Sequence, residues 1–467
     1  MAETVIHWFR RDLRLHDNPA LHAASKASSC VIPVYILSQW KVQHRWTGPR
    51  RQQFLCDCLD SLDQSLRHRG ARLVIRHGPP LAALEQLIVD SKATAVYFNR
   101  DVDLFGAKVE SSLHALCARL GVACHDFKDA VLHEPSEIQT QQGNPYRVYT
   151  PYSRVWLTKE KTSCLGLPQP FMVPQGVTSL PLPTLDWWQL SVPVSTHSSL
   201  AAGEDAARKR LDYAIENVLA GYAEKRDLPA GQNTSRLSQD LRFGLLSIRE
   251  IYHRVIKSME NARTESVRQS HLVYLKELAW REFYIQILHY CPEVLEHEFN
   301  PEYRQLIWDH DNAKLERWKS GVTGFPLVDA GMRELLATGF MHNRVRMIVS
   351  MFLTKDLHID WREGEKHFMQ HLLDGEIASN NGGWQWSAGT GADAAPYFRI
   401  QNPWTQTKRF DPEGTYIKSW VPELRHLPAA AFFQAPSPGL PLARGYPLPM
   451  VDHATERDET LARFKKR

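Results

Sequence analysis

Five short apolar runs in the first 130 residues constrain the fold of this chain more than any other feature. They lie at residues 5–9, 31–37, 72–75, 95–98 and 122–126, and helix-compatible stretches such as 52–69 and 108–120 separate them. Strands that alternate with helices at this spacing are typical of βαβ units. We therefore predict an α/β domain over residues 1–130, with a parallel five-stranded sheet and flanking helices.

The turn after the first predicted strand excludes two common nucleotide-binding folds. It consists of Arg10, Arg11, Asp12, Leu13 and Arg14, with no glycine. Neither GxGxxG nor GxxxxGK(S/T) occurs in the chain. The α/β domain is therefore not an ordinary dinucleotide-binding or P-loop domain.

The rest of the chain divides into a linker and a helical domain. From about residue 168 to 199 the composition shifts to Pro, Ser, Thr and Leu without periodicity, and we predict an interdomain linker over 131–200. Apolar residues then recur at helical spacing in 203–219, 247–257, 267–290, 327–336, 344–355 and 364–373. Strand-like alternation is absent, so we predict that residues 201–467 form an all-α domain.

Composition excludes several classes of protein. There is no apolar run of eighteen residues and no apolar stretch at the N-terminus, so we expect a cytoplasmic protein without a membrane span. The formal charge of only +4 excludes a uniformly basic surface, and any nucleic-acid site must be a local patch. The seven cysteines are scattered and never form CxxC, which argues against disulfides and a metal site.

Tryptophan is the unusual residue. The chain has fourteen, and seven of them fall between Trp280 and Trp404. A hydrophobic core rarely needs that much indole, so some of these side chains are candidates for a function beyond packing.

One face of the predicted helix 267–290 carries Glu277, Trp280, Arg281 and Tyr284 at i, i+3, i+4 and i+7. Two interpretations stay open. The face is exposed to solvent with an intrahelical Glu277–Arg281 ion pair, or its aromatic rings stack on a base beside an arginine that holds a phosphate.

Three further segments combine polar and aromatic residues. In 339–349, Asn343 and Met347 share a helix face with Arg346, Arg344 points elsewhere, and His342 is expected to be structural. In 374–386, two carboxylates, three amides, three glycines and two indoles predict a sharp turn close to a bound molecule. The hydroxyl-rich run at 234–238 predicts a helix start able to cradle phosphate.

Together these segments resemble the DNA photolyase/cryptochrome flavoprotein family. The resemblance runs from WFRRDLRLHDNPAL, through GFMHNRVRM and NNGGWQW, to YPLPMVDHATERDETLARFKK, and it covers nearly the whole chain. It is greatest to class I photolyases that repair cyclobutane pyrimidine dimers (CPDs). It implies an antenna-binding α/β domain and a helical domain that binds FAD.

The resemblance implies a set of FAD-binding residues. Those for the adenosine and pyrophosphate are Tyr222, Thr234, Ser235, Arg236, Leu237 and Ser238, and those around the flavin are Tyr274, Asn343, Arg346, Asp374, Gly375, Glu376 and Asn380. Asp374 is expected to pair with Arg346, and Asn380 to lie at the flavin N5. The family often has Asp at the position of Glu376.

The resemblance also implies light-driven repair by electron transfer from excited reduced FAD to a flipped-out dimer. Glu277 is expected to hydrogen-bond the dimer, Trp280 and Trp386 to form its aromatic wall, and Met347 to favour the cyclobutane over the (6-4) lesion. Trp384, Trp361 and Trp308 match an electron-hopping chain. The candidates for binding damaged DNA are Arg226, Arg281, Tyr284, Asn343, Arg344, Gln406, Lys408 and Arg409. We expect a monomer.

Other functions within this resemblance stay open. A cryptochrome-type light sensor keeps FAD and the tryptophans without repair, and a single-strand-preferring cryptochrome or a nucleotide-binding scaffold without chemistry are further alternatives. The expected antenna is a folate (methenyltetrahydrofolate) or 8-hydroxy-5-deazaflavin. Asp101 and Asp103, which follow the fourth predicted strand, are its candidate ligands.

Overall fold

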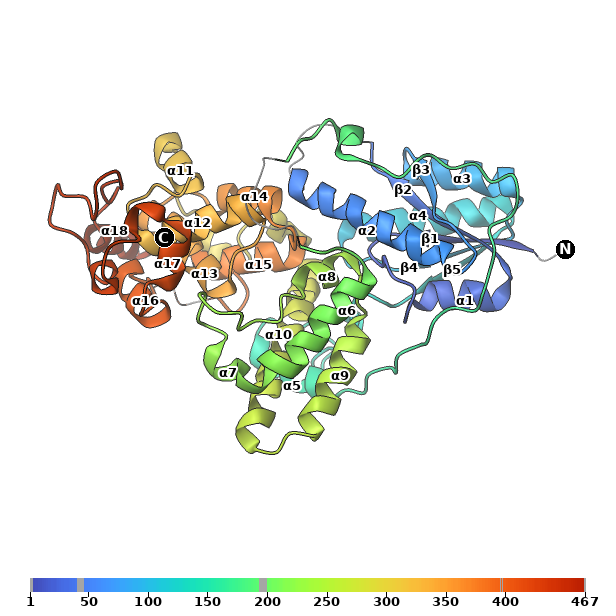
Figure 1. Cartoon of the computed structure of the whole chain (residues 1–467), viewed down its shortest axis with the longest axis horizontal. Helices are drawn as coiled ribbons and strands as arrows, with labels where there is room; N and C mark the ends of the chain where they lie inside the picture. Colours follow the sequence, from blue (N-terminus) through green and yellow to red (C-terminus); the bar gives the residue numbers. More distant parts are fainter. Residues whose placement is uncertain (1–2, 40–45, 193–199, 395, 397, 466–467) are drawn as a thin grey trace.

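The computed structural model describes residues 3–39, 46–192, 200–394, 396 and 398–465. Figure 1 shows an α/β part at one end and a helical part that extends away from it. None of the helices in the described ranges has the length and apolar character needed to cross a bilayer.

The N-terminal part is the predicted parallel sheet. Its strands are β1 (Thr4–Phe9), β2 (Cys30–Leu37), β3 (Val74–His77), β4 (Ala95–Asn99) and β5 (Ala123–Phe127), in the order β3-β2-β1-β4-β5. All four pairings are parallel, with Ile6 opposite Ile32 on one side and Val96 on the other. Because β2 and β4 flank β1, the strand order reverses there and opens a crevice at the carboxyl ends of β1 and β4.

Helices cover both faces of this sheet. They are α1 (Pro19–Ala27), α2 (Pro49–Arg67), α3 (Pro80–Ser91) and α4 (Leu104–Leu120). Alternate residues of β1 enter two different core clusters, Val5 and Phe9 on one face and Ile6 and Trp8 on the other. The strands are therefore buried on both faces, which is why they appear in the sequence as continuous apolar runs.

The segment 131–200, for which the sequence predicts a linker, contains a helix that the composition did not indicate. This helix, α5 (Tyr149–Thr158), packs against the helical part and buries Trp156. The Pro-rich stretch beyond it runs along the sheet, where the Leu180 amide donates to the Ile75 carbonyl at 3.0 Å. That bond covers the otherwise open edge of β3.

The remainder is helical, as predicted, and the described residues there form no extended strand. The helices are α6 (Glu204–Tyr213), α7 (Tyr222–Lys225), α8 (Ser238–Phe243), α9 (Ile248–Glu260), α10 (Glu265–Tyr290), α11 (Asn312–Lys319), α12 (Pro326–Thr338), α13 (Asn343–Met351), α14 (Trp361–His371), α15 (Ile377–Ala388), α16 (Pro403–Phe410), α17 (Thr415–Trp420) and α18 (His453–Lys465). The longest, α10, contacts α5, α7, α9 and α15 and forms the centre of this part.

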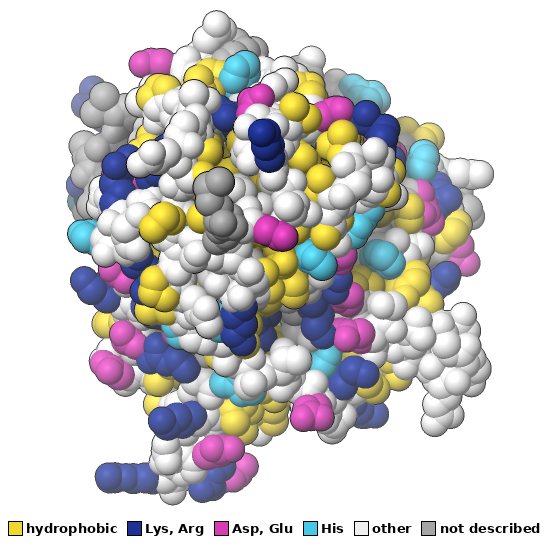
Figure 2. All heavy atoms as spheres, turned by 90° about the vertical axis from the view of Figure 1, so that its right-hand side faces the viewer, with side chains coloured by type: hydrophobic (Ala, Val, Ile, Leu, Met, Phe, Trp, Pro, Cys, Tyr) yellow, Lys and Arg dark blue, Asp and Glu magenta, His cyan; other side chains and the backbone are white. Residues whose placement is uncertain are grey.

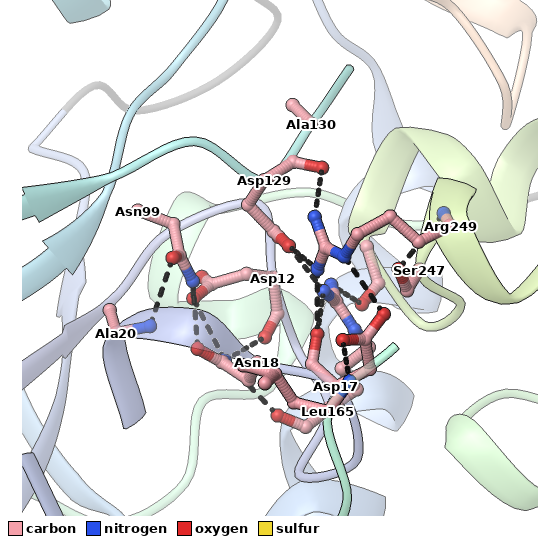
Figure 3. Close-up of polar contacts among 12 residues, drawn as sticks. Asp12, Asp17, Asn18, Ala20, Asn99, Asp129, Ala130, Leu165, Ser247 and Arg249 are labelled. Atoms are coloured by element: carbon pink, nitrogen blue, oxygen red, sulfur yellow. Dashed lines mark hydrogen bonds and ion pairs between the residues drawn. The ribbon is translucent and has the colours of Figure 1, made fainter. Parts of the chain in front are cut away.

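A buried ion-pair network joins the two parts (Figure 3). Arg249 of α9 pairs with Asp17 at 3.0 Å and with Asp129 at 2.7 Å, and Arg14 pairs with the same Asp129. Arg14 also donates to the Gly244 carbonyl of the helical part at 3.1 Å. Burial alone would raise the pKa of Asp129, but Arg14 and Arg249 outweigh that effect and hold the pKa below its ordinary value.

We expect Asp129→Asn to lower the free energy of unfolding by about 3–5 kcal/mol, because two buried guanidinium groups lose a shared carboxylate. Urea unfolding followed by tryptophan fluorescence measures this change. The control is Asp458→Asn, which breaks an exposed 3.3 Å pair with Arg457 and should change stability by less than about 0.5 kcal/mol. Equal losses in the two variants would contradict a central role for Asp129.

Candidate functional site

A cavity of about 540 Å³ lies among the helices of the helical part. Most residues singled out from the sequence line it, namely Tyr222, Arg226, Thr234, Ser235, Arg236, Leu237, Ser238, Tyr274, Glu277, Trp280, Arg281, Tyr284, Asn343, Arg344, Arg346, Met347, Asp374, Gly375, Glu376, Asn380, Trp384 and Trp386. The fold therefore gathers side chains from α7, α8, α10, α13 and α15 around one space large enough for a sizeable ligand.

The polar and aromatic face of α10 points into this cavity. Glu277 pairs with Arg226 of the loop after α7, and Arg281 pairs with Glu376 at 3.1 Å. The intrahelical Glu277–Arg281 pair of the solvent-exposed interpretation does not form, and that interpretation is wrong. Arg281 also donates to the Ala130 carbonyl at 2.7 Å, so its guanidinium is already engaged within the protein.

Trp280 is fixed by an aromatic neighbour that sequence reasoning missed. The ring of Tyr149 stacks on it with centroids 3.6 Å apart and planes 9° apart, and the Tyr149 hydroxyl donates to the Lys276 carbonyl at 2.6 Å. Tyr149 belongs to α5, inside the predicted linker, and no local pattern could link it to α10. One face of the indole is thus held by the protein while Trp280 lines the cavity.

Glu277 has the electrostatics of a potential proton donor. Burial in the cavity wall raises its pKa, an effect that the neighbouring Arg226 opposes. A raised pKa keeps the carboxyl protonated to higher pH than in water. In this structure the carboxyl is also ion-paired with Arg226.

The first turn of α13 supplies a second wall. Asn343, Arg346 and Met347 line the cavity, and so does Arg344, which the sequence placed on another side. Arg344 pairs with Asp227 at 2.8 Å and lies over the Phe410 ring, which draws it toward the cavity. His342 is structural, since its Nδ1 accepts a hydrogen bond from the Arg344 amide at 3.2 Å and caps the helix.

An ion pair crosses the floor of the cavity. Arg346 pairs with Asp374 at 2.9 Å, and the Ser238 hydroxyl donates to the same carboxylate oxygen at 2.6 Å. Burial favours a higher pKa for Asp374, but Arg346 outweighs it and lowers the pKa. The other oxygen of Asp374 is buried and has no hydrogen-bond partner among the described residues. A bound polar ligand with a hydrogen-bond donor would satisfy it.

The run 234–238 corrects a prediction. The helix α8 begins only at Ser238, and no side chain caps it. Arg236 has a φ of 53°, a left-handed conformation that keeps the preceding residues out of the helix. The Arg236 guanidinium lies 3.4 Å from the Phe340 ring centroid, and the Tyr274 hydroxyl donates to Ser235 at 3.1 Å. These residues form a polar loop at the cavity instead of a helix start.

Glu376 reaches across to the α/β part. Its carboxylate pairs with Arg281 and with Arg11, which follows β1 and also pairs with Asp101 at 2.9 Å. Burial opposes ionisation, but the arginines prevail and lower the pKa of Glu376 to about 2. The Glu376 carboxylate therefore belongs to a series of ion pairs that runs from the carboxyl end of β1 to the cavity.

The predicted antenna ligands are engaged within the protein. Asp101 pairs with Arg11, and Asp103 caps α4 by accepting from the Gly106 amide at 2.7 Å. The described residues beside them enclose only about 10 Å³, the space of roughly one water molecule. Residues 40–45 lie outside the described ranges.

The segment 374–386 also corrects a prediction. Gly382 and Gly383 do not make a turn, because residues Ile377–Ala388 form the continuous helix α15. Gly382 lies against the Tyr284 ring, where a Cβ would come within 2.1 Å of a ring carbon. Gly383 faces the cavity with no atom within 4 Å of a Cβ position. A Cβ at Gly375 would likewise come within 2.1 Å of the Arg51 guanidinium, so two glycines of the segment are closely approached by protein side chains.

The three tryptophans of the predicted electron-hopping chain belong to, or pack against, one core cluster. Trp384 lines the cavity and is buried against Gly364 of α14. Trp361 begins α14, is fully buried, and donates to Glu298 at 3.1 Å. Trp308 packs at the edge of the same core cluster and is partly exposed. Trp361 and Trp308 do not line the cavity.

The remaining DNA-binding candidates lie outside the cavity. Gln406, Lys408 and Arg409 are on α16, with the two basic side chains exposed. At the α/β end of the molecule, Figure 2 shows Lys and Arg interspersed with Asp and Glu and no gathering of one sign. The described side chains of this face therefore form no basic patch.

Family models match both parts of this chain. One described as DNA photolyase matches residues 5–174, and one described as the FAD binding domain of DNA photolyase matches residues 274–466. A protein of Synechococcus sp. named deoxyribodipyrimidine photo-lyase is 38% identical over 475 residues, which cover 100% of this chain and 97% of that protein.

Solved structures agree over the full length. A class III photolyase from Agrobacterium tumefaciens has a TM-score of 0.92 and 38% identity, covering 100% of this chain and 98% of that one. A photolyase from Sulfolobus tokodaii, described with two FAD molecules, has a TM-score of 0.85 and 30% identity, covering 99% and 100%. A cryptochrome from Synechocystis sp. has a TM-score of 0.87 and 32% identity, covering 98% and 99%.

The two neighbouring glycines of α15 provide a matched test of the packing at Tyr284. We expect Gly382→Ala to lower the free energy of unfolding by about 1–3 kcal/mol, because the ring must move. Gly383→Ala should leave stability unchanged or raise it by up to about 1 kcal/mol through helix propensity. Thermal unfolding of both variants measures the difference, and equal melting temperatures would show that Tyr284 does not pack as described.

Proposed function

This chain belongs to the DNA photolyase family, and we propose that it uses light to split cyclobutane pyrimidine dimers in DNA. The observation that carries the proposal is that Glu277, Trp280, Trp386 and Met347 line the same cavity as the Asp374–Arg346 pair. A lesion-binding set and a cofactor-binding set share one space, as a reaction between cofactor and lesion requires.

We propose FAD as the cofactor, and the residues present fit it. Ser235, Arg236 and Ser238 offer hydroxyl and guanidinium donors suited to a pyrophosphate, beside Tyr222. The unpartnered oxygen of Asp374 can accept a hydrogen bond from the ring system, and Asn380 lines the same wall. When bound and fully reduced, FAD supplies the light-excited electron that opens the dimer.

The lesion side of the cavity suits a flipped-out pyrimidine pair. Photolyases are among the enzymes that take their target base out of the stack. Trp280, backed by Tyr149, and Trp386 present flat walls, and Glu277, whose pKa is raised by burial, lines the same cavity. The described residues that line the cavity include no histidine, which favours the cyclobutane over the (6-4) lesion.

Arginines near the cavity are candidates for phosphate contacts. Arg226 and Arg344 line it and remain partly exposed, with Asn343 beside them. Arg281 is less suited, because Glu376 and the Ala130 carbonyl already occupy it. Lys408, Arg409 and Gln406 on α16 lie further out and could follow the strand beyond the lesion.

Finer assignments stay predictions. Membership of class I is one, since the solved structure with a TM-score of 0.92 is of a class III photolyase. A second chromophore, folate or deazaflavin, near Asp101 and Asp103 is another. The Sulfolobus tokodaii photolyase described with two FAD molecules supports a second chromophore in general. A monomer in the cytoplasm with access to DNA is a third.

The deciding experiment is light-dependent repair. Protein loaded with fully reduced FAD should restore dimer-containing DNA in blue or near-ultraviolet light and leave it unchanged in darkness. The likeness to the Synechocystis cryptochrome makes a light sensor the second candidate. Tight binding of FAD with no repair by the reduced protein would favour the sensor.

We propose that Trp384, Trp361 and Trp308 pass electrons inward from the surface to the cavity. Trp384→Phe should block photoreduction of oxidised protein and leave repair by chemically reduced protein largely intact, because Trp384 is the chain member at the cavity. The control is Trp318→Phe. Trp318 is fully buried and packs edge-on against Trp384 at 6.0 Å but lies outside the predicted chain. Unchanged photoreduction in Trp384→Phe would refute the assignment.

A further inference from the structure

We propose that Arg463 of the C-terminal helix α18 is a positioning residue that holds Trp308 at the outer end of the tryptophan chain. This inference rests on the proposed role of Trp308 in electron transfer. Arg463 is 155 positions from Trp308 in the sequence but lies beside it in the fold.

The first step is the contact itself. The two terminal nitrogens of Arg463 pair with the two carboxylate oxygens of Asp309 at 2.8 and 3.1 Å. One of these nitrogens also donates to the Ile307 carbonyl at 3.5 Å. Ile307 and Asp309 are the residues on either side of Trp308. The Arg463 guanidinium therefore contacts the backbone before Trp308 and the side chain after it. Its contact with Asp309 is bidentate, which fixes the relative orientation of the two side chains.

The second step is the connection between Asp309 and the segment that leads to Trp361. The Asp309 amide donates to the His358 carbonyl at 2.8 Å, and Asp309 forms an isolated parallel bridge with Ile359. Ile359 lies two residues before Trp361. The backbone that carries Trp308 is thus held in register with the backbone that leads into Trp361.

The third step is the anchoring of α18. Glu456 pairs with His358 at 2.8 Å, and the Thr460 hydroxyl donates to the Lys355 carbonyl. Glu459, one turn before Arg463, pairs with its Nε at 2.8 Å and orients the guanidinium. These contacts hold α18 against the segment between α13 and α14, and Arg463 follows them in the sequence.

The loop depends on such support. Residues 304–311 lie in no helix or strand, and Ile307 is 82% exposed. A loop with so little buried apolar surface opens easily unless polar contacts hold it. Hopping between indoles falls steeply with ring separation, so a loose Trp308 would exchange electrons with Trp361 less efficiently. In this step Trp308 gives one electron inward and regains one from an external thiol reductant.

The test compares Arg463→Ala with Arg457→Ala. Arg457 lies on the same helix and pairs only with Asp458 at 3.3 Å among the contacts described for it, far from any tryptophan in sequence. Hydrogen exchange of the peptide covering 301–311, measured on protein without cofactor, should accelerate by about tenfold or more in Arg463→Ala, because charge-assisted hydrogen bonds are lost. Arg457→Ala should exchange as the wild type does.

Photoreduction of the FAD-loaded protein gives the second readout. Arg463→Ala should reduce its quantum yield several-fold, and Arg463→Lys, which can still reach Asp309 with one nitrogen, should restore part of it. Asp309→Asn removes the partner without altering α18 and should act like Arg463→Ala, so the inference stays testable if the alanine variant does not fold.

Trp308→Phe separates the two possible failures. If it photoreduces as the wild type does, the proposed electron chain is wrong. If it loses photoreduction while Arg463→Ala and Asp309→Asn keep wild-type yields, the chain stands and the role of Arg463 is refuted. Faster hydrogen exchange of the loop without a loss of photoreduction yield would equally refute the role of Arg463, since electron transfer would then not depend on an ordered loop.

Discussion

The shared carboxylate of Asp129 is the interaction on which the rest of the structure depends. Arg14 from the α/β part and Arg249 from the helical part both pair with it, at a site that water does not reach. Buried charges are costly unless they are paired, so the two parts have few ways to dock. That docking brings Arg11, which follows β1, to Glu376 at the cavity. The carboxyl end of the sheet thereby becomes part of the functional site.

Inside the cavity, the carboxyl groups differ in pKa because their neighbours differ. Glu277 has a raised pKa, since burial outweighs the effect of Arg226 and Arg344, whereas Glu376 between Arg11 and Arg281 has a pKa of about 2. Asp374 is also held ionised, by Arg346. The wall formed by α10 thus carries a carboxyl with a raised pKa, while the floor of the cavity carries carboxylates that arginines hold ionised. One pocket can in this way bind a neutral pyrimidine and a polar cofactor.

The pattern of apolar residues predicted those strands and helices whose burial produces that pattern. The strands were found because a parallel sheet buries both faces of each strand, and the long helix α10 was found because one stripe of it enters the core. The turn expected at Gly382 and Gly383 was wrong, since a glycine pair weakens a helix without ending it when packing against Tyr284 requires the space. The helix α5 was missed because its stabilising partner, α10, is more than a hundred residues away.

The sequence by itself determined the two-part architecture, the polar face of α10 and, through family resemblance, about two thirds of the residues that line the cavity. Only the tertiary structure decided which charges pair and which rings stack. Arg281 turns to Glu376 instead of Glu277, Tyr149 supports Trp280, and Arg463 brackets Trp308. The physical reason is that periodicity reports interactions within a turn or a strand, whereas these contacts join residues about 95 to 155 positions apart, and such pairs are selected by the geometry of docking.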